Sequence, residues 1–104
     1  MNLKQYQKEI EKTWLRNDYD TIRILLGIGG EAGELFELYK KYYRGDNIIG
    51  IVDKIEKEIG DLSYYIAKLC NLTGLDWEKI LEVNVKKLQS RKKRGKIKGS
   101  GDSR

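Results

Sequence analysis

The sequence predicts an all-α fold, a four-helix bundle in a single domain. None of the 104 residues is proline, and this favours long uninterrupted helices. Apolar residues recur at steps of three and four, as on the buried face of a helix. A bundle of this length has a thin hydrophobic core, so we expect it to be completed by oligomerisation.

The first helix is expected from Leu3 to about Asn17. Tyr6, Ile10 and Trp14 would lie along one side of it. Trp14 and Tyr6 would either belong to the core or stack on a nucleobase.

The second helix is expected from about Thr21 to Tyr43, with its end at Gly45. Glycines crowd its first half, although each costs about 1 kcal/mol relative to alanine inside a helix. They stand at Gly27, Gly29, Gly30 and Gly33. We interpret them as the mark of a kink, or of close approach by a neighbouring helix or ligand.

The third helix is expected from about Ile51 to Thr73, with its end at Gly74. The fourth would run from about Trp77 to Arg91, with Asp76 as its N-cap. Residues 1–93 would form the domain, and residues 94–104 a flexible basic Gly/Ser tail.

Two acidic pairs lie in apolar stripes and have no basic partner on the following turn: Glu31 with Glu34, and Glu58 with Asp61. Their i,i+3 spacing puts both carboxylates of a pair on one helix face. Unpaired charges on a core-facing stripe are costly, so a bound cation would compensate them. The chain has no histidine, so the ligands would be oxygen atoms, which suit Mg²⁺, Mn²⁺ or Ca²⁺. Alternatively, the helices rotate slightly and the acids reach water at the stripe edge.

The net charge of +5 is unevenly placed, because residues 86–104 hold nine Lys/Arg and one acid. Asn84, Lys87 and Arg91 share one face of the fourth helix. That face would either contact phosphates or be an ordinary solvated surface.

Three segments together resemble the MazG-like nucleoside triphosphate pyrophosphohydrolases: GEAGEL at 30–35, EIGD at 58–61, and NVKKL at 84–88 followed by Arg91. The resemblance covers about residues 5–95, and 23 residues separate Glu34 from Glu58. The tail is similar to the end of small, often phage-encoded, members. The resemblance implies a homodimer or homotetramer and hydrolysis between the α and β phosphates of a (d)NTP. The cofactor would be Mg²⁺, with Mn²⁺ as a second option, and the role nucleotide-pool house-cleaning.

The resemblance also implies roles for individual residues. The metal-binding and catalytic residues would be Glu31, Glu34, Glu58 and Asp61. Glu34 is a candidate general base. The substrate-binding residues would be Lys40, Lys41, Asn84, Lys87, Arg91 and, through base stacking, Trp14.

Two other classes of function remain open. The basic tail could bind nucleic acid, although it lacks aromatic residues for base stacking; alternatively, it could close over bound nucleotide as a phosphate lid. A non-catalytic helical dimer is the other class.

The first fifteen residues predict no signal peptide, no apolar stretch predicts a membrane span, and the single Cys70 is expected to be buried. These features predict a cytoplasmic protein.

Overall fold

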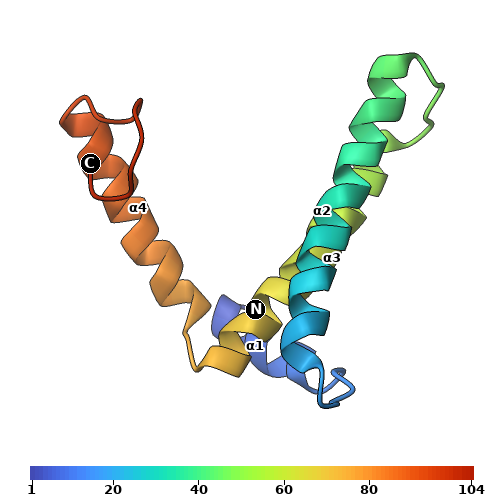
Figure 1. Ribbon diagram of the computed structural model, residues 1–104, viewed down its shortest axis with the longest axis horizontal. Coiled ribbons are helices and arrows are strands. Elements are labelled where there is room, and N and C mark those ends of the chain that lie inside the picture. Colours follow the sequence, from blue (N-terminus) through green and yellow to red (C-terminus); the bar gives the residue numbers. More distant parts are fainter.

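Four helices and no strand form the chain in this computed structural model, which describes all residues 1–104 (Figure 1). The predicted all-α fold is confirmed. The helices are α1 (Leu3–Glu11), α2 (Asp20–Arg44), α3 (Ile51–Thr73) and α4 (Trp77–Lys93).

Helix α1 ends at Glu11, so the prediction that it reaches Asn17 is wrong. Side chains compete with the helix for backbone groups beyond this point. Asn17 accepts a hydrogen bond from the backbone N–H of Tyr19, and Asp20 accepts one from the backbone N–H of Asn17. The resulting turn leads the chain from α1 into α2.

The other helix ends lie close to their predicted positions. Gly45 ends α2 with φ +94°, and Gly74 ends α3 with φ +71°, both in the left-handed region that favours glycine. Asp76 caps α4 by accepting a hydrogen bond from the backbone N–H of Lys79. Helix α4 continues two residues past Arg91, to Lys93.

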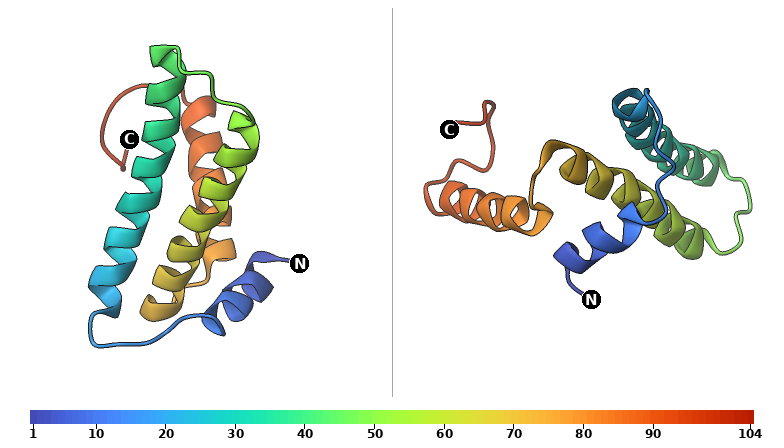
Figure 2. Two further views of the ribbon diagram at one scale, coloured as in Figure 1. Left: turned by 90° about the vertical axis from the view of Figure 1, so that its right-hand side faces the viewer. Right: turned by 90° about the horizontal axis from the view of Figure 1, so that it is seen from below.

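Helices α2 and α3 lie side by side along their length and are joined by the short loop after Gly45 (Figures 1 and 2). Gly27 explains their close approach near the base of the pair. A Cβ built on Gly27 would lie 2.3 Å from Cε1 of Tyr65, closer than real contacts allow. Gly29, Gly30 and Gly33 have no such neighbour in the chain. The expected close approach is therefore confirmed for Gly27.

Helix α1 joins the base of α3 to α4 through the buried side chain of Gln7. Its Nε2 donates to Asn71 Oδ1 (2.9 Å) and to the Leu75 carbonyl (3.1 Å), and its Oε1 accepts from the backbone N–H of Trp77 (3.0 Å). The rings of Tyr6 and Trp77 lie 6.2 Å apart. Gln7 thus links α1 to the end of α3 and to the first residue of α4, with its buried amide satisfied by hydrogen bonds.

The α2/α3 pair and α4 form the two arms of a V, with α1 at its base (Figure 1). Only 8 of 104 residues are buried. The radius of gyration is 16.9 Å, whereas a compact domain of this length has about 13 Å. Cys70 is among the buried residues, as expected. The helices include none that is both long and apolar enough to cross a membrane.

Candidate metal centre

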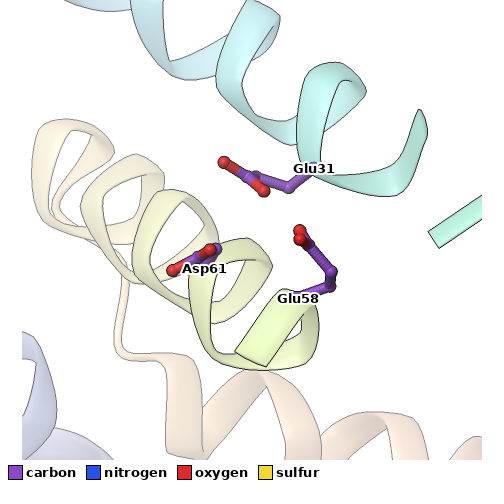
Figure 3. Close-up of side chains that lie close together, drawn as sticks. All are labelled: Glu31, Glu58 and Asp61. Carbon is purple, nitrogen blue, oxygen red and sulfur yellow. The ribbon is translucent and has the colours of Figure 1, made fainter. Parts of the chain in front are cut away.

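Three carboxylates from the two long helices converge near the middle of the α2/α3 pair (Figure 3). Glu31 comes from α2, and Glu58 and Asp61 come from successive turns of α3. One oxygen atom from each lies within 4.8 Å of those of the other two. The i,i+3 spacing on α3 and the close packing of α2 thus bring together residues that 26 positions separate in the sequence.

The cluster is only partly shielded from water: Glu31 and Glu58 are half-buried, whereas Asp61 is exposed. The Oε2 atom of Glu58 is buried and has no hydrogen-bond partner. A hydrogen bond shared with Glu58, burial and the nearby negative charges raise the pKa of Glu31 from 4.5 to about 7. Without a cation, Glu31 therefore keeps its proton up to a pH of about 7.

A hard divalent cation fits this arrangement. Mg²⁺ and Mn²⁺ bind carboxylate oxygens, and this cluster supplies three such groups at short mutual distance. The buried Oε2 of Glu58 lacks the partner that a buried acceptor normally has. Glu31, Glu58 and Asp61 are the residues that would hold such an ion.

The structure places Glu34 beside this cluster rather than within it. Its side chain is exposed and lines an open groove of about 240 Å³ together with Glu58. Lys41, Lys54 and Lys57 line the same groove. The alternative that the acids reach water at a stripe edge therefore describes Glu34 and Asp61 fully, and the half-buried Glu31 and Glu58 only in part.

The basic residues around this groove were only partly anticipated. Lys41 lines it, whereas Lys40 forms an exposed ion pair with Glu37 at 2.8 Å. Sequence reasoning missed Lys54 and Lys57. The spacing of Lys54, four residues before Glu58, is the pattern that could have indicated it.

Asn84, Lys87 and Arg91 lie on α4, the other arm of the V (Figure 1). Asn84 and Lys87 line a second open groove of about 410 Å³. The side chain of Arg91 is 8% exposed. One copy of the chain therefore does not bring these three residues to the carboxylates. Lys87 and Arg91 instead contact Asp102 in the tail, a residue that sequence reasoning did not single out.

Trp14 is buried and packs against residues of α2 and α3. Its ring lies 6.0 Å from that of Tyr64 and 6.2 Å from that of Tyr65. The Arg23 guanidinium lies 4.5 Å and the Lys68 ammonium 5.2 Å from the ring centroid. In the single chain Trp14 therefore occupies a core position, packed among aromatic rings and beneath two cations.

Most of the chain is similar to a known protein family. Residues 20–95 match the MazG nucleotide pyrophosphohydrolase domain. The chain belongs to the MazG family. It is also similar to the gene 37 protein of Mycobacterium phage L5, with 38% identity over 86 residues, covering 78% of this chain and 74% of the phage protein. No solved structure matches the chain.

The segment matching the MazG domain contains the three converging carboxylates, Glu34 and the polar face of α4. Trp14 and Asp102 lie outside it. The match to the MazG domain therefore gives no information about the contacts that Trp14 and Asp102 make.

Proposed function

We propose that this MazG protein is a Mg²⁺-dependent nucleoside triphosphate pyrophosphohydrolase that converts (d)NTP to (d)NMP and pyrophosphate in the cytoplasm. Nucleotide-pool house-cleaning would be its role. The observation that carries the proposal is the convergence of Glu31, Glu58 and Asp61 around a buried, unpartnered carboxylate oxygen of Glu58. A scaffold would gain nothing from three mutually repelling acids at this position.

The residues around the cluster suit a triphosphate. When bound, Mg²⁺ would neutralise phosphate charge and acidify a nearby water molecule. Glu34 lies on the exposed rim of the groove, where its carboxylate can accept a proton from the attacking water. Lys41, Lys54 and Lys57 line the same groove and can bind phosphate oxygens. Mn²⁺ would serve the same ligands.

The deciding measurement is pyrophosphate release from a panel of canonical, deoxy and damaged nucleotides, with Mg²⁺ or Mn²⁺. Glu58→Gln removes the charge of this half-buried carboxylate while preserving its shape. We expect activity to fall by about 100-fold or more, since a metal ion contributes several kcal/mol to catalysis. Glu56→Gln is the matched control, because Glu56 is exposed on the same helix and lies outside the cluster.

Unchanged Mg²⁺-dependent pyrophosphate release in Glu58→Gln would contradict the proposal. Equal losses in both variants would also count against it, because they would indicate an effect of charge on α3 as a whole.

We further propose that the functional unit is a homodimer or homotetramer. Both arms of the V expose apolar side chains that a lone bundle would bury: Ile22, Leu26 and Phe36 on α2, Val52 and Ile59 on α3, and Val83 on α4. Large exposed apolar patches mark interaction surfaces. A second copy packed against these surfaces could also bring an α4 helix, with its Asn84 and Lys87, next to the carboxylate cluster.

A further inference from the structure

The C-terminal segment 95–104 folds back along the end of α4 (Figure 1, red). Arg104 closes this segment into a loop by donating hydrogen bonds to three backbone carbonyls. The acceptors are Lys96 (3.0 Å), Ile97 (3.0 Å) and Gly101 (2.6 Å). The loop holds Asp102 against α4.

Asp102 contacts both cations of the polar face of α4. Its Oδ1 accepts from Lys87 Nζ at 2.8 Å and from Arg91 Nη2 at 3.2 Å. Arg91 Nη2 also donates to the backbone carbonyl of Asp102 at 2.6 Å. Arg91 makes no other side-chain hydrogen bond. The tail therefore supplies both hydrogen-bond acceptors of the nearly buried Arg91 guanidinium.

A carboxylate held in this way occupies donors that a phosphate would use, because Arg and Lys bind both groups through the same N–H bonds. Lys87, with a smaller contribution from Arg91, lowers the pKa of Asp102 below its ordinary value of 3.8. The carboxyl is therefore charged at neutral pH. A phosphate approaching Lys87 and Arg91 would meet a like charge already in place, so the two anions exclude each other.

We propose that Asp102 is an intramolecular competitor of the triphosphate, and that it must release Lys87 and Arg91 before polyphosphate binds them. The inference rests on the proposed function and on the proposed assembly, in which α4 of a second copy completes the site. It makes the tail an autoinhibitory segment. A phosphate lid would have the opposite effect on nucleotide affinity. Removing a lid weakens nucleotide binding, whereas removing a competitor strengthens it.

The test uses the full chain and inorganic tripolyphosphate with Mg²⁺, with affinity measured by titration calorimetry. Asp102→Asn preserves the shape of the side chain but removes its charge. We expect it to bind tripolyphosphate several-fold more tightly than the unaltered protein, because a larger fraction of molecules then has both cations free. Asp18→Asn is the matched control: Asp18 is an exposed carboxylate in the α1–α2 turn with no ion pair, and its loss should leave affinity unchanged.

A second variant acts without altering Asp102. Arg104→Ala removes the hydrogen bonds that close the tail loop, so it too should tighten binding. Saturating tripolyphosphate should also accelerate trypsin cleavage after Lys98 in the unaltered protein, because a tail released from α4 is free to adopt the extended conformation that a protease binds.

Equal or weaker tripolyphosphate binding by Asp102→Asn would overturn the inference, and so would an absence of binding by every variant. Cleavage after Lys98 that tripolyphosphate leaves unchanged would overturn it as well. These results are separable from failure of the proposed function. In that case the unaltered protein would release no pyrophosphate from any nucleotide, whatever the affinity of the Asp102 variant.

Discussion

Glu31 must lose its proton before the acidic cluster can bind a cation fully. Without a cation its pKa is raised to about 7, chiefly through the hydrogen bond shared with Glu58. A cation requires deprotonated carboxylates, so binding must displace this proton. The affinity for Mg²⁺ is therefore expected to rise with pH up to about 7 and to level off above it.

The same proton makes the stability of the metal-free protein depend on pH. In the folded chain Glu31 keeps its proton up to about 7, whereas in the unfolded chain it loses it near the ordinary value of 4.5. Folding then binds a proton, so this contribution to stability is complete below pH 4.5 and is lost as the pH rises to about 7. We expect the Tm in EDTA to fall across this interval, and the fall to be smaller in Glu31→Gln.

Millimolar Mg²⁺ provides the complementary measurement. Above about pH 7 it should raise the Tm of the unaltered protein, since a ligand that binds only the folded state stabilises it. Glu31→Gln should show a smaller rise. A Tm in EDTA that is flat across the interval, together with no response to Mg²⁺, would contradict a shared proton at this cluster.

The α2/α3 pair is the element that holds the cluster together, and within it Gly27 packs against the Tyr65 ring with no room for a side chain. Gly27 lies one turn before Glu31, and Tyr65 lies one turn after Asp61. The contact therefore fixes the separation of the two helices within one turn of the carboxylates. Any change in that separation would be transmitted to the distances between their oxygen atoms.

Gly27→Ala tests this directly. The added Cβ would lie 2.3 Å from Cε1 of Tyr65, so the ring or the helices must move. We expect a loss of about 1–3 kcal/mol in the free energy of unfolding, as for other overpacked cores, and weaker Mg²⁺ binding. Chemical denaturation and Mg²⁺ titration would measure the two effects.

Gly30→Ala is the matched control, because a Cβ there meets no atom within 4 Å. It should gain up to about 1 kcal/mol from helix propensity. Equal stability changes in the two variants would show that backbone propensity, not the Tyr65 contact, governs this stretch of α2.

The sequence predicted these elements well where local chemistry determines them. Gly45 and Gly74 end α2 and α3 through their own backbone preference, and Asp76 caps α4 through its own side chain. The end of α1 was wrong, because the turn there depends on several weak side-chain bonds that compete with helix formation. Helix periodicity alone does not show whether these side-chain bonds or a further turn of helix will form.

The candidate site was likewise predicted only in part. Spacing and missing partners on the following turn predicted the carboxylate cluster, because they fix which helix face a charge shares. Spacing did not predict that Glu34 would lie at the exposed rim, since that depends on the rotation of α2 against α3. The contact of Asp102 with Lys87 could not be predicted from the sequence either, because a glycine-rich segment has no periodicity from which to infer its path.

At the scale of the whole molecule, the open V indicates that one copy does not bury a complete core. Phe36 on α2 is 73% exposed, and Val83 on α4 is 62% exposed. At about 25 cal/mol per Å² of apolar surface, covering such side chains is a large part of what stabilises a small domain. Folding and association are therefore expected to be coupled in this protein.

Phe36→Glu tests this coupling. In a lone chain an exposed charge at this position would change stability by no more than about 0.5 kcal/mol, whereas at an interface it would be buried and unpaired. We expect a smaller assembly by light scattering and a lower Tm that depends on protein concentration. Leu15→Glu is the matched control, because Leu15 is 80% exposed in the α1–α2 turn. A monomeric unaltered protein would contradict coupled assembly.

Under the proposed function, the tail contact would also set how the protein responds to changing nucleotide levels. When a segment blocks a site in most molecules, the apparent dissociation constant is the intrinsic one divided by the open fraction. If Asp102 covered Lys87 and Arg91 in about 90% of molecules, their affinity for phosphate would be weakened about tenfold. The gain in affinity on replacing Asp102 would then report the closed population directly. A substitution in the tail would thus shift the nucleotide concentration at which the protein begins to work, without altering any carboxylate of the candidate metal centre.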